Sequence, residues 1–296
     1  MKSTHLLSLG TAVLLGLVLT AASTVALSAR AANFPFPGTP PTEVLRVCAD
    51  PNNLPFSNKA QEGFENKIAQ MVADFFEVKL EFVWLPQRMG FVRNTLKKWL
   101  PEENRFACDI IMGVPAEFDQ AVASRPYYKS AYSLVASQNS VLKGISTIDD
   151  VAAMPDRDKV TLKLAGFSPS PTVTWLQMHN LFFETQFFRT MSGDPEVYPG
   201  RIVERVAEGE FDGVMIWGPI AGYFSRTNPA LKVLPLKNGP HGRVTFSISM
   251  AVRYGEQSFG YAVEHALKVN YDKVRDILNE YGVPQLDSQE IYERLR

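Results

Sequence analysis

The sequence predicts an α/β protein with two lobes, joined by a two-strand hinge and separated by an interlobe cleft. Short apolar strands alternate with amphipathic helices over residues 44–114 and again over residues 161–236, which is the pattern of parallel sheets covered by helices. Extended segments at residues 126–137 and 244–252 separate the two blocks and return the chain to the first. Two-lobe proteins bind ligands or partners between their lobes, so the cleft is the expected functional site.

The first block consists of three strands and two helices in alternation. Its strands are apolar runs with few polar interruptions, as expected for strands that are covered on both faces. The first helix carries apolar residues on one face, at positions 64, 68, 71, 72 and 75. We expect strands at residues 44–49, 79–85 and 108–114, and helices at residues 63–76 and 91–100.

The second block repeats this alternation after the first crossing segment. We expect strands at residues 161–167, near 197, at 211–217 and at 231–236, with helices at 172–183, 200–208 and 219–225. After the return crossing, residues 257–281 are largely helical in pattern, and Gly282 and Pro284 end that pattern. The charged tail after residue 286 has the pattern of a short surface helix.

This order assigns the chain to two lobes. Lobe 1 is expected to comprise residues 44–133 plus 247–296, and lobe 2 residues 134–246. About 265 mature residues are enough for two lobes that each have a core.

The first 31 residues have the composition of a signal peptide. Lys2 precedes an apolar run over residues 6–27, and Ala29 and Ala31 are small residues of the kind found before a signal-peptidase cleavage point. We therefore expect cleavage after Ala31, export to the periplasm, and a Pro-rich lead-in over residues 32–43. The alternative is an uncleaved membrane anchor, because the apolar run is long enough to span a bilayer. No later run reaches ~18 apolar residues, so we expect no membrane insertion after cleavage.

The charge balance argues against a polyanionic partner. The chain has 30 basic and 31 acidic residues, and removal of the two basic residues in the leader gives a net charge of −3. Proteins that bind nucleic acid or anionic membranes carry a basic excess instead. Neither partner is therefore expected.

Polar and aromatic side chains gather where strands are expected to end. The loop after the first strand follows the carboxyl end of that strand, the edge where open α/β sheets place ligands. The alternative is that this loop uses Pro and Asn for turn geometry alone, and that Trp217 packs inside a core. The candidate ligand- or partner-binding residues of the cleft are Asp50, Asn52, Phe56, Arg88, Arg125, Tyr127, Tyr128 and Trp217.

The sequence offers no catalytic or metal site. It has no dinucleotide-binding, P-loop, nucleophile-elbow or zinc-protease motif. The histidines after the leader, His179, His241 and His265, are far apart in the sequence. No triad is therefore expected, and each is interpreted as a structural or surface histidine. An enzyme on this scaffold would need an acid–base pair in the cleft, and the sequence nominates none.

The chain has two cysteines, Cys48 in the first strand and Cys108 at the start of a strand that we expect beside it. A disulfide needs the two α-carbons within about 7 Å. The register of parallel strands could separate them by more. The sequence is therefore compatible either with a disulfide or with two free thiols.

Several segments resemble the two-lobe (type II) periplasmic solute-binding proteins that bind amino acids. These are RVCADPNNLPFS, EGFENKIAQMVADFF, CDIIMGVP, SRPYYKSAY and FDGVMIWGPIAGYF, spread over residues 44–281. The resemblance implies their fold but not their ligand. Where those proteins use an arginine for the substrate carboxylate this chain has Glu117, and where they use an aspartate for the ammonium group it has Trp217. Because these side chains cannot hold a zwitterion by the same charges, a free amino acid is not an expected ligand.

A narrower resemblance rests on CADPNNLPFSN, EGFENKIA, PQRMGF and WGPIAGYF. These segments are similar to the MoxJ-type and XoxJ-type proteins that accompany quinoprotein methanol dehydrogenases in methylotrophic bacteria. The resemblance implies a non-enzymatic periplasmic accessory protein that engages the dehydrogenase and assists its assembly or activation. The PQQ cofactor and its metal ion would belong to the partner enzyme, and this chain would hold no cofactor.

Two other functions stay open. One is a solute-binding protein that delivers a small ligand, other than a free amino acid, to a transporter or enzyme. The other is an enzyme on the same scaffold, as in the dehydratases that resemble it. Aromatic side chains near the cleft suit protein anchors, and they also suit a planar small molecule.

Overall fold

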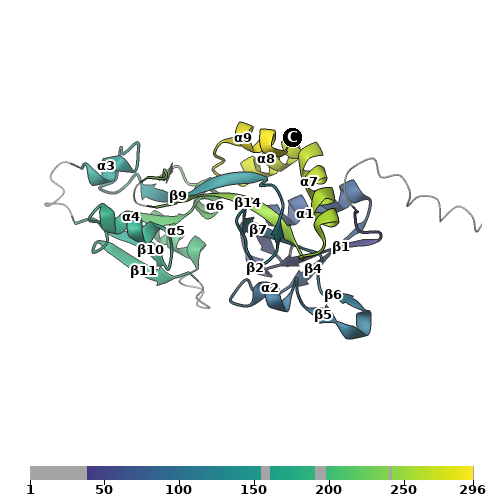
Figure 1. Ribbon diagram of the computed structural model, residues 1–296. Coiled ribbons are helices and arrows are strands. Elements are labelled where there is room, and N and C mark those ends of the chain that lie inside the picture. The colour runs from purple at the N-terminus through teal and green to yellow at the C-terminus, as the bar shows by residue number, and fades with distance from the viewer. Residues whose placement is uncertain (1–38, 155–160, 191–197, 240–241, 296) are drawn as a thin grey trace, which may run out of the picture. The chain divides into compact units, whose positions relative to one another are not determined.

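The computed structural model describes residues 39–154, 161–190, 198–239 and 242–295 (Figure 1). The expected signal peptide, most of the Pro-rich lead-in, the strand expected near residue 197 and His241 lie outside the described residues. No helix within the described ranges is long and apolar enough to cross a bilayer.

The N-terminal part of the sheet is built as the sequence predicts. Strand β1 (Val44–Ala49) lies between β4 (Lys79–Trp84) and β7 (Ile110–Pro115), and both neighbours run parallel to it. The last three residues of β1 are buried, which explains its continuous apolar run. Helix α1 (Phe64–Phe76) follows β1, and it buries positions 64, 68, 71 and 72 of the predicted face. Phe75 is only partly buried, and Phe76 is buried in its place.

The strands form one ten-stranded mixed sheet. Along its main path the order is β11-β10-β12-β9-β14-β7-β1-β4. The two long central strands, β9 (Tyr128–Ser137) and β14 (Thr245–Val252), pair antiparallel and connect the two groups of parallel strands (Figure 1). They are the crossing segments of the sequence analysis. The remaining strands of the sheet are β8 (Val122–Ala123), β10 (Leu164–Ser168), β11 (Thr185–Arg189), β12 (Gly213–Trp217) and β13 (Leu231–Pro235).

The buried side chains form separate clusters rather than one continuous core. The largest surrounds Phe64 and Ile68 of α1 and includes residues of α7 (Gln257–Val269) and α8 (Tyr271–Glu280). Two further clusters occupy the part of the sheet around β10 and β12. Their helices are α4 (Thr172–Met178), α5 (Pro199–Ala207) and α6 (Gly218–Ser225). Each group of parallel strands therefore has its own buried side chains, as an α/β layer requires.

Four further short elements lie outside the main sheet and its large helices. They are β2 (Asn52–Asn53), β3 (Ser57–Asn58), α3 (Asp149–Ala152) and α9 (Ser288–Leu295). The tail is helical, as expected, but it does not lie wholly on the surface, because Ile291 is 2% exposed and packs against Tyr271.

The prediction of a helix over residues 91–100 is wrong beyond the first turn. Helix α2 spans Phe91–Asn94, and the Thr95 hydroxyl then donates to the Phe91 carbonyl oxygen at 2.7 Å. The Thr95 backbone leaves the helical region, with φ −128° and ψ −85°. The chain continues into a hairpin of β5 (Trp99–Leu100) and β6 (Arg105–Phe106), joined by a 3-10 turn at Pro101–Glu103.

The helix expected over residues 172–183 also ends early, at Met178. Asn180 adopts the left-handed conformation with φ 54°, and the Leu181 N–H donates to the Leu176 carbonyl oxygen at 2.8 Å. This closure satisfies a carbonyl at the helix end. The following residues form β11, a strand that the sequence analysis did not predict.

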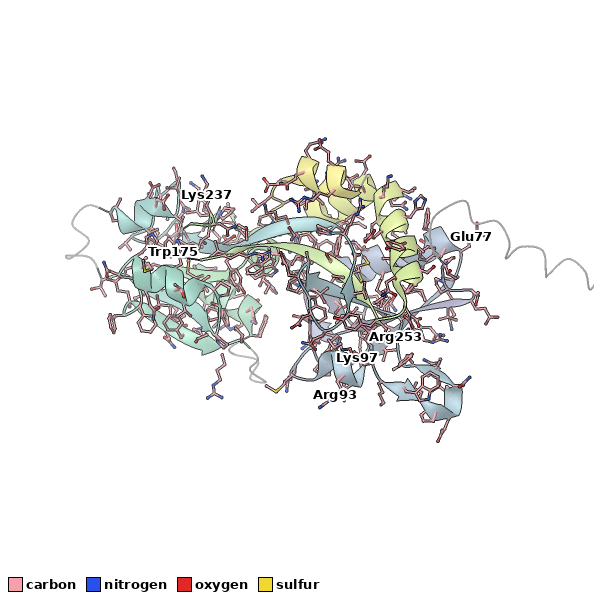
Figure 2. The ribbon with its side chains drawn as sticks, viewed as in Figure 1. Glu77, Arg93, Lys97, Trp175, Lys237 and Arg253 are labelled. Atoms are coloured by element: carbon pink, nitrogen blue, oxygen red, sulfur yellow. A yellow bond between two sulfur atoms is a disulfide. The ribbon has the colours of Figure 1, made fainter. Side chains whose placement is uncertain are left out.

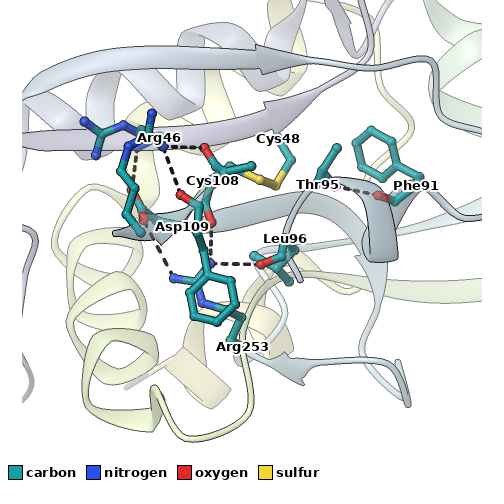
Figure 3. Close-up of a disulfide and its surroundings, with 11 residues drawn as sticks. Arg46, Cys48, Phe91, Thr95, Leu96, Cys108, Asp109 and Arg253 are labelled. Carbon is teal, nitrogen blue, oxygen red and sulfur yellow. Dashed lines mark hydrogen bonds and ion pairs between the residues drawn. A yellow bond between two sulfur atoms is a disulfide. The ribbon is translucent and has the colours of Figure 1, made fainter. Parts of the chain in front are cut away.

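The structure joins Cys48 and Cys108 by a disulfide, with their α-carbons 5.6 Å apart (Figure 3). Both cysteines are buried, and they belong to a cluster with Phe91 and Leu96. The guanidinium of Arg253 donates to the carbonyl oxygens of Leu96 and Cys108 (Figure 3). The disulfide therefore joins β1 to the residues before β7, and Arg253 links those residues to the segment after α2.

Candidate ligand- or partner-binding cavity

A cavity of about 1060 Å³ lies at the carboxyl ends of β1, β4, β7 and β12, the edge at which the sequence analysis placed the cleft. The crossing strands β9 and β14 supply part of its wall, and residues around α5 and α6 supply the rest. Its lining includes Asp50–Leu54, Phe56, Pro86–Arg88, Gly113, Pro115, Tyr132, Thr190, Tyr198–Gly200, Trp217, Ile220, Phe224, Phe246 and Ile248.

Asp50 holds the loops at the cavity rim together. One of its carboxylate oxygens accepts the Asn52 N–H at 2.8 Å, and the other accepts the Gln87 N–H at 2.5 Å. The Asn53 amide donates to the Gln87 side chain at 3.3 Å. Because both carboxylate oxygens already accept backbone hydrogens, Asp50 acts chiefly as a positioning residue. It links the loop after β1 to the loop after β4, which carries Arg88.

The loop after β1 also requires its glycine. The chain returns from β3 into α1 at Gly63, where a Cβ atom would lie 2.6 Å from the Ser57 nitrogen and overlap the Phe56 carbonyl. The Asn66 side chain accepts the N–H groups of both Gly63 and Asn58 at 3.1 Å. These contacts place Phe56 at the cavity edge with its ring 5.3 Å from that of Phe64.

One wall of the cavity is an aromatic group of Trp217, Tyr132 and Phe246. The Trp217 ring centroid lies 5.2 Å from Tyr132 and 6.0 Å from Phe246, and Tyr132 and Phe246 are 6.2 Å apart. Burial raises the pKa of the Tyr132 hydroxyl, so it is a neutral hydrogen-bonding group at physiological pH. We call these three residues the aromatic wall.

Trp217 reaches the aromatic wall because of its place in the chain. It ends β12 and precedes α6, whose first two residues are Gly218 and Pro219. A Cβ atom on Gly218 would lie 2.7 Å from the Ser130 hydroxyl and overlap the Ala131 carbonyl. Only glycine therefore lets the chain turn so close to β9 immediately after Trp217.

The charge at Glu117 is already compensated. Its carboxylate pairs with the Arg243 guanidinium at 3.0 Å, and this ion pair lowers the pKa of the Glu117 carboxyl. The same guanidinium lies 4.8 Å from the centroid of the Phe246 ring. Arg243 therefore links the charged pair to the aromatic wall through a cation–π contact.

A buried carboxyl lies next to the cavity lining. Gly113 lines the cavity, and a Cβ atom there would overlap the Glu65 carboxylate. Burial raises the pKa of Glu65 to about 8. Burial, together with the Glu65 charge, raises the pKa values of Tyr127 and Tyr128 well above their usual range. Glu65 is thus mainly protonated at neutral pH.

The structure brings together five of the eight candidate residues, Asp50, Asn52, Phe56, Arg88 and Trp217, around this cavity. The other three do not line it. Tyr127 and Tyr128 are buried at the start of β9, with the Tyr128 ring 6.1 Å from Phe64. The guanidinium of Arg125 donates to the Arg294 carbonyl oxygen at 2.6 Å, and the backbone N–H of Arg125 donates to the Glu264 carboxylate at 2.7 Å. The expectation that these three residues face the cleft therefore needs correction. Tyr127 and Tyr128 pack into the core where β9 begins, and Arg125 contacts Glu264 and Arg294 instead.

Tyr132 and Phe246 also line the cavity but were not among the predicted residues. Both lie on the crossing strands, which were expected only to connect the lobes. Tyr132 follows Tyr128 by an even number of residues along β9, and Phe246 pairs with Ser130 on the same strand. An aromatic residue on each crossing strand was the available signal.

Across the described ranges, no group of three or more His, Cys, Asp or Glu residues is placed to hold a metal ion.

The fold and the cavity define a binding protein of the two-lobe, type II periplasmic class. A solved structure of an ancestral amino-acid-binding protein, AncCDT-1, has this fold. Its TM-score is 0.54 at 20% identity, over 81% of this chain and 95% of that one. No protein-family model matches the chain.

Three relatives identify a narrower group. The crystallised periplasmic binding protein XoxJ from Methylobacterium extorquens AM1 is 32% identical, covers 82% of this chain and 99% of its own, and has a TM-score of 0.64. MxaJ from Methylophaga aminisulfidivorans is 28% identical over 82% of this chain and all of its own, with a TM-score of 0.66. Protein MoxJ of Paracoccus denitrificans is 29% identical over 85% of this chain and 92% of that protein. The chain belongs to the family of XoxJ-type and MoxJ-type periplasmic binding proteins.

Proposed function

We propose that the chain is a non-enzymatic periplasmic accessory protein that engages a quinoprotein methanol dehydrogenase and assists its assembly or activation. Its family supports the periplasmic location and the link to the dehydrogenase, because proteins of this type accompany that enzyme. In this proposal the PQQ cofactor and metal ion belong to the dehydrogenase. The proposed lobes are residues 44–133 plus 247–296 and residues 134–246, with β9 and β14 as the hinge.

The observation that carries the proposal is the aromatic wall in a large cavity. Amino-acid binders of this fold place a cation and an anion in the cleft. Here one of those positions is Trp217, and the other is Glu117, already paired with Arg243. A volume of about 1060 Å³ slightly exceeds the range of small-molecule pockets, about 300–1,000 Å³. As the occupant of the cavity, these features favour a segment of a protein over a zwitterionic amino acid.

The chemistry of the lining suits a protein anchor site. Trp, Tyr and Arg are the residues most enriched among interface hot spots, and Trp217, Tyr132 and Arg88 supply all three types at one cavity. Trp217 and Tyr132 are partly exposed rather than fully buried, so each keeps surface for a partner to cover. A partner segment that covers them would gain both hydrophobic burial and ring contacts.

A second candidate function is the capture of a planar small molecule for delivery to a transporter or enzyme. The same aromatic wall favours it, because a flat ring system can stack on Trp217 or Tyr132. The two functions differ in what the purified protein carries. A protein partner would co-purify in the first, and a small molecule would in the second.

The test is capture from the periplasm of the native host. The mature protein carries a tag after Arg296 and is compared with Trp217→Ala and with Phe183→Ala. Phe183 is 98% exposed and does not line the cavity, so it is a matched control for the loss of an aromatic side chain. We expect a quinoprotein dehydrogenase with the wild type and the control. Loss of a hot spot worth about 2 kcal/mol should weaken its retention by Trp217→Ala about 30-fold.

An eluate with a bound small molecule and no dehydrogenase would refute the proposal and support solute capture. Equal recovery of the dehydrogenase by all three proteins would leave the accessory role standing, but it would remove the aromatic wall from the interface.

A further inference from the structure

A second feature lies outside the cavity, in the segment that follows β4. Residues 82–101 contain four basic residues and no acidic residue, in a chain whose total net charge is −1. The four are Arg88, Arg93, Lys97 and Lys98, and we call their surface the basic face.

The local fold directs these four side chains outward. Phe91 and Val92 of α2 and Leu96 after it are buried in the cluster that contains the disulfide. Arg93, Lys97 and Lys98 alternate with these buried positions and are exposed (Figure 2 labels Arg93 and Lys97). The apolar side of this segment packs on the cluster that contains the disulfide, and Arg253 donates to the Leu96 carbonyl oxygen. The basic face is therefore supported by the core beneath it.

The basic face is not neutralised by its own chain. No ion pair involves any of its four residues within the described ranges. The Lys97 ammonium makes a cation–π contact, 5.6 Å from the ring centroid of Tyr254. Two of the carboxylates nearby pair with other arginines, whereas Glu102 has no ion pair within the described ranges. Glu103 pairs with Arg105, and Glu256 pairs with the buried Arg253 at 2.7 Å.

Asp109 is also engaged. Its carboxylate lies 3.7 Å from the Arg253 guanidinium and accepts the Arg46 N–H at 2.8 Å (Figure 3). Arg105 and Arg253 have therefore paired with Glu103, Glu256 and Asp109. None of the four exposed cations of the basic face has an ion-pair partner within the described ranges, which favours a positive local potential.

The basic face is continuous with the cavity. Pro86, Gln87 and Arg88 line the cavity, and the basic face runs on from Arg88 through α2. Met89, between the rim and α2, is 97% exposed. A charged rim beside an apolar centre is the usual anatomy of a protein interface. A partner that inserts a segment into the cavity would therefore meet the basic face with the surface beside that segment.

We propose that the basic face docks an acidic surface of a protein partner, next to the segment that enters the cavity. A protein is favoured over a membrane because the chain as a whole is slightly acidic and the positive charge adjoins an apolar cavity. The proposal rests on the proposed function for the identity of the partner, but not for the partner's charge. The basic face acts through long-range attraction, so it affects association more than dissociation.

The experiment uses a triple charge reversal, Arg93→Glu, Lys97→Glu and Lys98→Glu. Arg88 is left intact because it belongs to the cavity lining. The matched control reverses three exposed lysines that do not line the cavity, Lys143→Glu, Lys163→Glu and Lys237→Glu. Both variants change the net charge equally, so only the position of the charge differs. A neutral variant, Arg93→Gln, Lys97→Gln and Lys98→Gln, covers the case in which the reversal disturbs folding.

Association is measured with two probes, the methanol dehydrogenase isolated from the same host and a short poly-glutamate peptide. For both probes we expect the basic-face reversal to slow association at least about tenfold, with little change for the control. Raising NaCl from about 50 to about 500 mM should slow association of the wild type and leave the basic-face reversal almost unchanged.

The two probes separate this proposal from the proposed function. If only poly-glutamate binds the wild type, and the basic-face reversal abolishes that binding, the acidic-partner proposal stands and the dehydrogenase proposal fails. Equal association rates for all variants would overturn the docking proposal. Binding of phosphatidylglycerol vesicles without binding of either probe would also overturn it, because the partner would then be a membrane surface.

Discussion

Replacement of Glu65 by glutamine should remove a specific pH dependence of stability. Glu65 lies in the first turn of α1, beside Gly113 of the cavity lining and near Tyr127 and Tyr128. Glutamine has nearly the same shape but no proton to lose. Burial raises the pKa of the Glu65 carboxyl from 4.5 to about 8. The folded chain therefore keeps a proton that an unfolded chain loses near pH 4.5.

The sign of the effect follows from this difference. Between about pH 4.5 and 8 the folded state binds more protons than the unfolded state, so the free energy of unfolding falls as pH rises. The contribution is complete below pH 4.5 and lost above about pH 8. A pKa shift of one unit corresponds to about 1.4 kcal/mol, which sets an upper limit of about 5 kcal/mol. Because Glu65 is only partly buried over its whole surface, solvent screening reduces this, and we expect about 2 kcal/mol.

Thermal unfolding between pH 5 and 9 measures this effect. For a domain of this size, about 2 kcal/mol corresponds to a change in Tm of about 4–8 °C. The wild type should lose that much more Tm over this range than Glu65→Gln does. Glu102→Gln, at an exposed position on the hairpin turn, should follow the wild type. Parallel profiles for the wild type and Glu65→Gln would show that the carboxyl is ionised in the folded protein, and the reasoning would fail.

Two further predictions concern covalent and steric restraints. The Cys48–Cys108 disulfide closes a loop with a sequence separation of 60 residues. Chain entropy then predicts that Cys48→Ser combined with Cys108→Ser lowers the free energy of unfolding by about 4 kcal/mol in denaturant titration. An unchanged midpoint would contradict it. Gly222→Ala should destabilise by about 1–3 kcal/mol, because its Cβ would overlap the Gly282 carbonyl oxygen and lie 2.7 Å from the carbonyl carbon. Gly260→Ala, whose nearest contact is a Val252 methyl at 3.3 Å, is the milder control, and equal losses of Tm for both would refute the steric argument.

Sequence patterns predicted the elements whose burial follows from local periodicity. Strand β1 has the predicted bounds because its apolar run needs cover on both faces, and α1 has the predicted face because its apolar residues recur at helical spacing. The helix after residue 91 failed because a local hydrogen bond from Thr95 and the hairpin that follows stop it after one turn. That hairpin depends on pairing between residues on either side of the Pro101–Glu103 turn, which helical periodicity does not encode.

The cavity was predictable only where it is formed by strand ends. Asp50, Arg88 and Trp217 each follow or end a parallel strand, so the rule for ligand sites in open sheets applies to them. Tyr132 and Phe246 could not be found in this way. Their positions depend on the antiparallel register of β9 with β14, strands separated by more than a hundred residues. Tyr127 and Tyr128 have the composition of a cleft mouth, but the entry of β9 into the core buries them.

The positions of the charged side chains support both proposals. Near the cavity, Arg243 forms an ion pair with Glu117 and lies over the Phe246 ring, so the aromatic wall remains an apolar surface. Around α2, buried Arg253 pairs with two of the nearby carboxylates, and the exposed cations have no ion-pair partner within the described ranges. An apolar centre governs how slowly a complex dissociates, whereas charges at the rim govern how fast it forms. Loss of Trp217 should therefore act on dissociation and reversal of the basic face on association, and this kinetic difference distinguishes one composite interface from two unrelated surfaces.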